Sequence, residues 1–346
     1  MATPDLTVRG AGIFGLSIAW AAARRGAVVR VIETASVGAG ASGGVVGAMA
    51  PHVPEAWNEK KAFQLHSLLM AQDWWAAVEA AGGVLSGYAR LGRLQPLADA
   101  AAVEAASQRG KNAETLWHGQ AVWRVVHAAG AGWEPVSVSG WLVEDTLSAR
   151  IAPRQALRAL VAALTVRGGQ VVSDDAAEIG PVIWATGVPG LQALSQAAGR
   201  MVGAGQKGQA ALLALDMPHA PQVFAEGVHI VPHGDGTVAI GSTTEREWQD
   251  PAGTDTALDD LIAKARALCP LLMGARVVER WAGLRPRAST RAPLIGAWPG
   301  RAGHFIANGG FKIGFGMAPG VAEAMVDLVL DGRDSIPEAF RPDALF

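Results

Sequence analysis

The sequence has a single cysteine and no excess of either charge. Cys269 stands alone among 346 residues, which excludes an intrachain disulfide and a cysteine-based metal site. We expect it to be a buried, inert thiol. The 29 basic and 31 acidic side chains give a formal net charge of −2. No basic excess therefore points to nucleic acid or to an anionic membrane surface.

Long hydrophobic runs are missing as well. Charged residues or glycines interrupt each apolar stretch, so none of them predicts a transmembrane helix. The opening stretch MATPDLTVRG lacks the basic region and apolar run of a signal peptide. The length suggests about two domains at roughly 150 residues each. Together these features predict a globular cytoplasmic protein that does not insert into a membrane.

Glycine, by contrast, is abundant, and the pattern G-x-G-x-x-G occurs three times: GAGIFG at 10–15, GAGASG at 38–43 and GAGQKG at 203–208. Only the first copy follows an apolar run (LTVR) and precedes a helical pattern (LSIAWAAARR), after which AVVRVIE reads as a second strand. In such a unit Gly10 allows a tight turn, Gly12 lets a pyrophosphate approach, and Gly15 lets the helix pack on the strand. Glu33 would then accept hydrogen bonds from a ribose.

The other two copies lack this context. GAGASG has no clean strand before it and no helix after it, but it follows Glu33 closely and could wrap the same cofactor. A strand-like run, QAALLALD, follows GAGQKG where a phosphate site needs a helix. We therefore interpret GAGQKG as a loop that serves the fold rather than as a second dinucleotide site.

The run RGAGIFGLSIAWAAARRGAVVRVIE, continued by GAGASGGVVGAMAPH, resembles the start of the D-amino-acid oxidase family of flavoenzymes, which includes glycine oxidase, sarcosine oxidase and D-amino-acid dehydrogenases. In that family the first loop binds the ADP half of FAD, and the Ala-Ser-Gly segment passes under the flavin. The resemblance implies FAD contacts at Gly10, Gly12, Ile13, Phe14, Gly15, Glu33, Thr34, Ala41, Ser42, Gly43, Gly44 and Gly47.

The resemblance continues in the middle of the chain. PVIWATG matches a family strand near the pyrophosphate, which implies contacts at Ala185, Thr186 and Gly187, and it implies that Val172 lies at the adenine. KGQ at 207–209 matches a motif at the start of the family's substrate domain.

Near the C-terminus, NGGFKIGFGMAP predicts a glycine loop before a helix that begins near Met317–Pro319. A helix N-terminus stabilises negative charge, such as that of a reduced flavin, and Lys312 would add positive charge there. The segment resembles the family's last FAD-binding loop, in which glycine oxidase has an arginine at the position of Lys312. The implied contacts are Gly309, Gly310, Phe311, Lys312, Ile313 and Gly314. The segment has no cysteine, so we expect non-covalent FAD.

WAGLRPR resembles the family's A-G-x-R-P segment, whose arginine binds the substrate carboxylate. By that resemblance Arg285 is the carboxylate anchor; the alternative is a surface arginine that pairs with Glu279. The family's xxIVP motif often carries a pocket tyrosine, which this chain lacks. His229 in HIVP could replace it, or could be an ordinary structural histidine. Trp281 and Trp248 hint at an aromatic wall, although tryptophans more often belong to the core.

We therefore expect an α/β fold like that of D-amino-acid and glycine oxidases. A Rossmann-like FAD-binding domain would comprise residues 1–82, 141–204 and 279–346, and an inserted mixed-sheet substrate domain would comprise 83–140 and 205–278. Arg285, His229 and Lys312 would serve the oxidation of a small amino acid (glycine, a D-amino acid or an N-methyl amino acid). Hydride transfer to flavin N5 would leave an imine that hydrolyses to an oxo acid.

O2 or another acceptor would reoxidise the flavin, and a homo-oligomer is compatible with the sequence. Three other functions stay open at this point. They are an FAD-binding subunit of a hetero-oligomeric amine or opine dehydrogenase, a flavin oxidase of a carboxymethylamino group in tRNA, and an NAD-binding regulator without catalysis.

Overall fold

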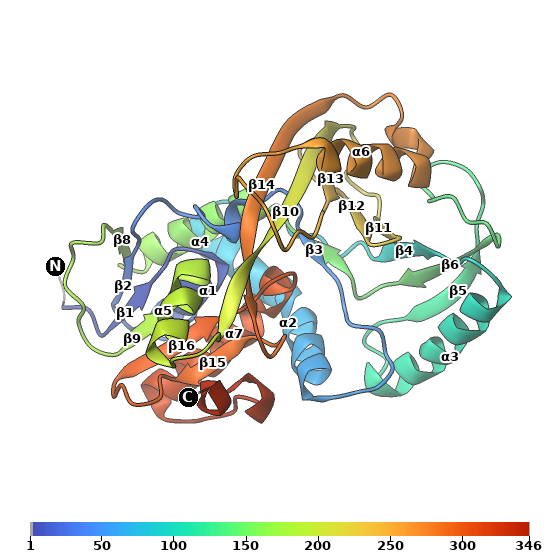
Figure 1. The fold of residues 1–346 in the computed structure, drawn as a ribbon. Helices are drawn as coiled ribbons and strands as arrows, with labels where there is room; N and C mark the ends of the chain where they lie inside the picture. Colours follow the sequence, from blue (N-terminus) through green and yellow to red (C-terminus); the bar gives the residue numbers. More distant parts are fainter. Residues whose placement is uncertain (1–2, 346) are drawn as a thin grey trace.

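A six-stranded sheet forms one half of the molecule (Figure 1). The computed structural model describes residues 3–345. The strands of this sheet, in spatial order, are β15 (Leu294–Ala297), β16 (His304–Asn308), β9 (Val182–Trp184), β1 (Leu6–Arg9), β2 (Val29–Ile32) and β8 (Gln170–Val172). Only the β15–β16 pair is antiparallel among them, and the other neighbours run parallel.

Helices pack beside this sheet in a layer of mutual contacts. This layer comprises α1 (Ile13–Arg24), α2 (Glu59–Gly82), α4 (Pro153–Val166) and α7 (Gly314–Asp331). The β1–α1–β2 unit predicted around GAGIFG is present. Helix α1 is buried along almost its whole length because small alanines let its neighbours approach closely. Helix α5 (Gly187–Ala197) instead contacts β10, β14 and β16.

An eight-stranded sheet forms the other half. Its order is β14 (Val277–Ala288), β10 (Gly203–Ala214), β13 (Thr237–Gly241), β12 (Val228–Pro232), β11 (Gln222–Ala225), β4 (Arg93–Pro96), β6 (Trp141–Asp145) and β5 (Trp123–His127). The β4–β11 pair is parallel within it, so the sheet is mixed as expected. Helix α6 (Thr256–Leu268) packs on β10, β12 and β13, and α3 (Ala100–Leu116) packs on β5.

The long strands β10 and β14 run between the two halves (Figure 1). They pair antiparallel, with Gln206 opposite Arg285 and Gly208 opposite Gly283. The prediction that GAGQKG forms a loop is therefore wrong, because it is the first half of β10. Its glycine at 208 has a packing reason: a Cβ there would lie 2.5 Å from Arg285 Cζ. A glycine within a strand commonly marks such a close approach.

Helix α7 also differs from the prediction, since it begins at Gly314 rather than near Met317. Pro319 therefore lies inside the helix. The turn before the proline is held by close packing on α2, where a Cβ at Gly316 would lie 3.2 Å from Leu68 Cδ2. After the proline, the Gly320 amide donates to Ser67 Oγ at 3.0 Å.

Strands β6 and β14 belong to the eight-stranded sheet. All of β6 and most of β14 nevertheless fall in the segments assigned from sequence to the FAD-binding domain. The domain boundaries stay a prediction. Three short elements complete the inner part of the fold: β3 (Ala48–Met49), which pairs with β7 (Ala149–Arg150), and the 3-10 turn η1 (Ala41–Gly43). Three more 3-10 turns are η2 (Pro270–Leu272), η3 (Glu338–Phe340) and η4 (Pro342–Leu345).

Cys269 is buried, as predicted, and burial raises the pKa of its thiol to about 11. Within residues 3–345, no helix is both long enough and apolar enough to cross a membrane.

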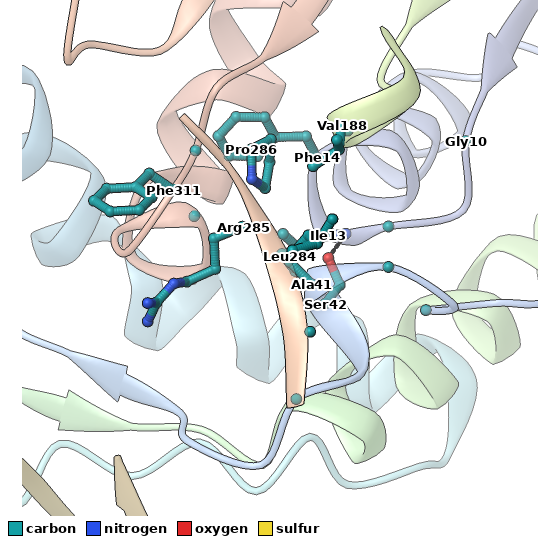
Figure 2. A pocket seen from close by; sticks show the side chains of 18 of the residues that line it. Gly10, Ile13, Phe14, Ala41, Ser42, Val188, Leu284, Arg285, Pro286 and Phe311 are labelled. Carbon is teal, nitrogen blue, oxygen red and sulfur yellow. Dashed lines mark hydrogen bonds between the residues drawn. The ribbon is translucent and has the colours of Figure 1, made fainter. Parts of the chain in front are cut away.

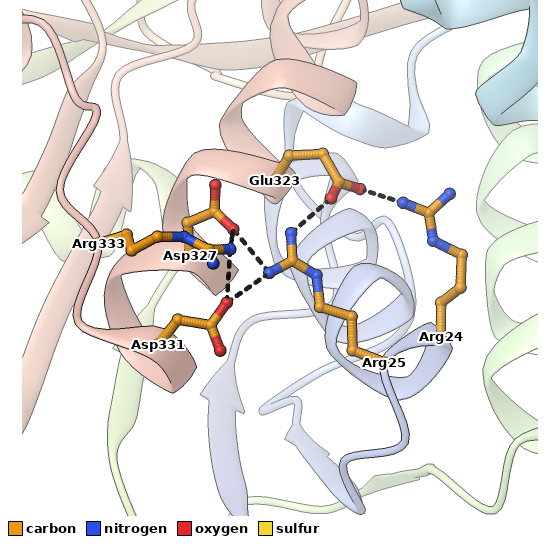
Figure 3. Close-up of polar contacts among 6 residues, drawn as sticks. All are labelled: Arg24, Arg25, Glu323, Asp327, Asp331 and Arg333. Atoms are coloured by element: carbon orange, nitrogen blue, oxygen red, sulfur yellow. Dashed lines mark hydrogen bonds and ion pairs between the residues drawn. The ribbon is translucent and has the colours of Figure 1, made fainter.

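An ion-pair network joins the C-terminal end of α1 to α7 (Figure 3). Arg25 binds Glu323 at 2.8 Å, Asp327 at 2.6 Å and Asp331 at 3.2 Å, whereas Arg24 pairs with a single acid of residues 3–345, Glu323, at 2.6 Å. Arg333 binds Asp327 at 2.8 Å. The network ties the first helix of the chain to the last long one.

Arg25→Ala should lower the free energy of unfolding by about 1 kcal/mol at pH 7, and Arg24→Ala by about half as much. The pKa of Asp327 is below its usual value because Arg333 donates a hydrogen bond to it, with Arg25 adding to the effect. A carboxyl with a lowered folded pKa stabilises above its unfolded value and loses that contribution on acidification.

The loss caused by Arg25→Ala should therefore be full above the unfolded value of 3.8 and shrink as the pH falls through the folded one. Urea unfolding at pH 7 and pH 3 measures it. Equal effects of the two substitutions would contradict the larger role of Arg25, and a loss that does not change with pH would show that its effect does not come from the ion pairs.

Candidate active site

The first glycine loop connects β1 to α1 and leaves the start of the helix open. Gly10 has φ +102°, and a Cβ there would lie 2.5 Å from the carbonyl oxygen of Ala185. A Cβ at Gly15 would overlap the carbonyl oxygen of Gly10. The N-cap of α1 is Gly12, which offers no side chain to its amides. The first turn of α1 is thus shaped to receive a phosphate.

Glu33 lies just beyond the end of β2 and faces this loop. Its carboxylate accepts hydrogen bonds from the amides of Ala11 at 2.7 Å and Ala35 at 3.0 Å. The carboxylate therefore lies beside the phosphate cradle, where a ribose would follow. Val172 lies behind it, with its carbonyl accepting from the Glu33 amide at 2.9 Å.

The second glycine segment lies against the first. Ser42 Oγ accepts a hydrogen bond from the Ile13 amide at 3.0 Å (Figure 2). Gly43 packs on Gly38, and Gly47 packs on Ile151, so closely that a Cβ at either position would overlap backbone oxygen. These two glycines shape the segment from behind, while Ala41, Ser42 and Gly44 face the cavity.

The C-terminal glycine segment, residues 309–314, leads into α7. The N-cap of α7 is Ile313, whose side chain makes no cap hydrogen bond, so this helix also presents an open N-terminus. Asn308 joins the segment to the loop after β9, because its side-chain amide donates to the Gly187 carbonyl at 2.8 Å. Three chain segments far apart in sequence thus meet around one space.

Arg285 lies on β14, and its side chain is only 8% exposed. Its guanidinium donates to Ser242 Oγ, to the Lys207 carbonyl at 3.1 Å and to the Thr243 carbonyl at 2.7 Å. All three acceptors are neutral, and no carboxylate within residues 3–345 forms an ion pair with it. The alternative of pairing with Glu279 is wrong, because Glu279 binds Arg154 at 2.7 and 3.0 Å. Burial lowers the pKa of Arg285 to about 10.

Two other predicted residues lie near this guanidinium. Lys312 Nζ donates to Thr244 Oγ1 at 2.9 Å and lies 5.8 Å from the centre of the Phe311 ring, over which Arg285 Cζ lies at 5.5 Å. Burial, together with Arg285 and Arg287, lowers the pKa of Lys312. His229 also lines the cavity, and burial, helped by nearby cations, lowers its pKa to about 3. Its imidazole is therefore neutral near pH 7.

These features surround one cavity of about 1080 Å³, at the upper end of the roughly 300–1,000 Å³ typical of ligand pockets. Figure 2 shows Gly10 at one end of its lining and Arg285 with Phe311 at the other. The predicted site residues that line it are Gly10, Gly12, Ile13, Phe14, Glu33, Thr34, Ala41, Ser42, Gly44, Ala185, Thr186, Gly187, His229, Arg285, Gly309, Gly310, Phe311, Lys312 and Gly314.

Five other predicted contacts lie outside this lining. They are Gly15, Gly43, Gly47, Val172 and Ile313. Conversely, Phe224, Ser242 and Trp184 line the cavity without having been predicted to do so. Trp281 lines it as the sequence hinted, whereas Trp248 does not. The strand positions of Phe224 and Trp184 gave no local signal, since an aromatic residue in a strand ordinarily reads as core.

Comparison with known proteins identifies the family. A family model described as "FAD dependent oxidoreductase", of the DAO family, matches residues 5–328. The chain belongs to the DAO family of FAD-dependent oxidoreductases. FAD is accordingly its cofactor, and the cavity fits it. The glycine cradle at α1 and Glu33 would hold the ADP half, and the segments at 41–44 and 309–314 would hold the flavin half.

Sequence relatives agree with this assignment, and a solved structure agrees with the fold. A Rhizobium etli protein named as a proposed thiamine biosynthesis oxidoreductase, ThiO, is 30% identical over 92% of this chain and 94% of its own length. Glycine oxidase of Pseudomonas putida is 37% identical over 35% of this chain, and the match spans only 33% of that enzyme. The structure of iminodiacetate oxidase from Chelativorans sp. BNC1 superposes with a TM-score of 0.85 at 21% identity, covering 97% of this chain and 98% of that one.

Proposed function

We propose that this chain oxidises the C–N bond of a small amino acid (glycine, a D-amino acid or an N-methyl amino acid). The observation that carries the proposal is Arg285, a buried guanidinium in the wall of the FAD cavity whose hydrogen-bond acceptors within residues 3–345 are all neutral. A substrate carboxylate would supply the missing negative charge and accept a hydrogen bond from the guanidinium, whose buried Nε has no partner within residues 3–345. Relatives named glycine oxidase and iminodiacetate oxidase, whose substrates carry an amine beside a carboxylate, support the same chemistry.

The residues of the chain divide the work of binding and orientation. Arg285 holds the α-carboxylate, which fixes the position of the neighbouring C–H and C–N bonds. Phe224 and Trp281 line the cavity with apolar surface and exclude water. His229 presents a neutral imidazole whose buried Nδ1 has no hydrogen-bond partner in the described part of the chain, so it is available to the substrate amine.

FAD, when bound, accepts the two electrons that leave the substrate as its C–N bond becomes an imine, which water then hydrolyses. The open N-terminus of α7 and the ammonium of Lys312 place positive potential where negative charge develops. Because orientation supplies much of the rate in such a step, the site needs no carboxylate pair or triad.

Anaerobic titration of the purified, FAD-loaded chain with glycine, D- and L-amino acids and N-methyl amino acids tests the proposal. We expect the visible absorption band of the flavin to bleach with at least one small amino acid and with no amine that lacks a carboxylate. A flavin that no amino acid bleaches would overturn the proposed function while leaving the family assignment intact.

The same preparation addresses acceptor and partners. We propose that the chain acts alone in the cytoplasm, with O2 or another small acceptor, and as a homo-oligomer if it assembles at all. Reoxidation of the bleached flavin on admitting air would support O2. Bleaching by the chain without added subunits would argue against a partner-dependent dehydrogenase, and the near-neutral charge argues against a tRNA substrate.

A further inference from the structure

A second cavity of about 230 Å³ adjoins the main one. The two share Ala48, Phe224, His229 and Lys312 in their linings, so they meet at the proposed catalytic end of the site. The second cavity extends from there between the segment 48–53, helix α2, strand β4 and the start of α7. A group bound at Arg285 therefore has room to extend beyond the space of a glycine molecule.

Polar groups that lack partners line this second cavity. Gln95 Nε2 and His229 Nδ1 are buried and have no hydrogen-bond partner among the residues described. Arg93 is 5% exposed and uses its Nε to bind Asp145 at 2.8 Å, and its guanidinium lies over the Phe224 ring, with Cζ 5.9 Å from the ring centre. Buried polar atoms are nearly always satisfied in folded proteins, so Gln95 Nε2 and His229 Nδ1 indicate a polar ligand.

The charged side chains that line the second cavity, among the described residues, are both basic. Its lining contains Arg93 and Lys312 but no aspartate or glutamate. Asp145 neutralises the charge of Arg93 through their ion pair, which leaves the ammonium of Lys312 as the unneutralised charge among the described lining residues. Lysine has three donors, and the bond to Thr244 uses one of them. A region with only positive charge and free donors attracts an anion.

Resting on the proposed function, we propose that the second cavity is a subsite for a second acidic group, so that the preferred substrate is an amino acid with a carboxylate-bearing side chain or N-substituent. Arg285 binds the carboxylate beside the amine. Lys312, Gln95 Nε2 and the Nη groups of Arg93 bind the other carboxylate. His229 lies at the junction and separates the two binding regions.

Succinate and butyrate test the subsite, because they have similar length but differ in the second carboxylate. Each is titrated into the FAD-loaded protein, and Kd is read from the change in the flavin spectrum and independently by calorimetry. We expect succinate to bind at least tenfold more tightly, since a hydrogen-bonded charge typically adds about that much affinity.

Gln95→Leu keeps the size of the side chain and removes its donor. It should weaken succinate by about tenfold and leave butyrate within about twofold. Equal affinities for the two acids, or a Gln95→Leu variant that binds succinate as the wild type does, would overturn the subsite. Tighter butyrate binding by Gln95→Leu together with unchanged succinate would assign the cavity to an apolar side chain instead.

Failure of the subsite and failure of the proposed function give different results. If glycine or an N-methyl amino acid bleaches the flavin but succinate has no advantage over butyrate, the function stands and the subsite is wrong. If succinate has its advantage but no amino acid, dicarboxylic ones included, bleaches the flavin, the anion subsite stands and amine oxidation is wrong.

Discussion

Arg285→Met should lower kcat/KM for the amino-acid substrate by about a hundred- to several-thousandfold. Removing one partner of a buried, hydrogen-bonded charge pair costs about 3–5 kcal/mol, and about 1.4 kcal/mol corresponds to a factor of ten. Arg285 has no carboxylate of the described chain to bind. The lost pair is therefore the one with the substrate. The rate of anaerobic flavin reduction as a function of substrate concentration measures the effect.

Arg287→Met is the matched control. Arg287 lies over the same Phe311 ring, at 5.6 Å, but does not line the cavity. It should keep kcat/KM within a few-fold, as expected of a residue away from the substrate. Arg285→Lys should fall between, since it keeps the charge and loses the Nε donor of the guanidinium. A full kcat/KM in Arg285→Met, with normal FAD content, would show that the carboxylate is bound elsewhere.

Arg285→Met should not destabilise the ligand-free protein. The folded pKa of Arg285, about 10, lies below its usual value of 12.5 because burial disfavours the charged form. A cation with a lowered folded pKa destabilises the fold at every pH below that value, and the effect is relieved only as the pH rises through it. Thermal unfolding of Arg285→Met at pH 7 should therefore occur no earlier than that of the wild type.

Gly15→Ala should abolish FAD binding. The added methyl would overlap the carbonyl oxygen of Gly10, so α1 and the loop cannot keep their present approach. Displacement of the helix N-terminus removes the amides and the positive potential that receive the pyrophosphate. We expect the purified variant to carry less than about a tenth of the wild-type FAD, because overpacking of this kind typically costs about 1–3 kcal/mol. The ratio of flavin to protein absorption measures it.

Two further glycines make this test specific. A Cβ at Gly274 would have no heavy atom within 4 Å, and Gly274 is outside the cavity lining, so Gly274→Ala should retain FAD. A Cβ at Gly12 would lie 3.1 Å from Ser42 Oγ, which allows the fold but fills the cradle. Gly12→Ala should therefore fold and bind FAD weakly. Full flavin content in both Gly12→Ala and Gly15→Ala would mean that the phosphates lie elsewhere.

Local patterns predicted the elements that depend on local physics. The helices α2, α4 and α6 are marked by local patterns of this kind, since apolar residues recur at helical spacing and Gly or Pro stands at their ends. The strand–loop–helix unit around GAGIFG was expected for the same reason. Each of its three glycines lies where another group must approach the backbone closely, as the spacing of the motif implies.

Long-range pairing explains what the sequence left out. GAGQKG looked like a loop because β10 acquires its partner, β14, from more than seventy residues further along the chain (285 − 206 = 79). The lining residues Phe224, on β11, and Ser242, directly after β13, have directions that are set by the whole eight-stranded sheet. The second cavity was likewise hidden, since Gln95 and Arg93 meet Lys312 only in the folded chain.

The guanidinium of Arg285 lies over Gly208, so substitutions at these two positions depend on each other. A side chain at 208 cannot arise while the guanidinium occupies that space, and the guanidinium cannot move while its three acceptors hold it. A descendant that gives up carboxylate binding would lose the need for Arg285, and only then would position 208 be free to mutate. On the role proposed for Arg285, glycine at 208 should therefore be lost only in lineages that have also changed substrate class.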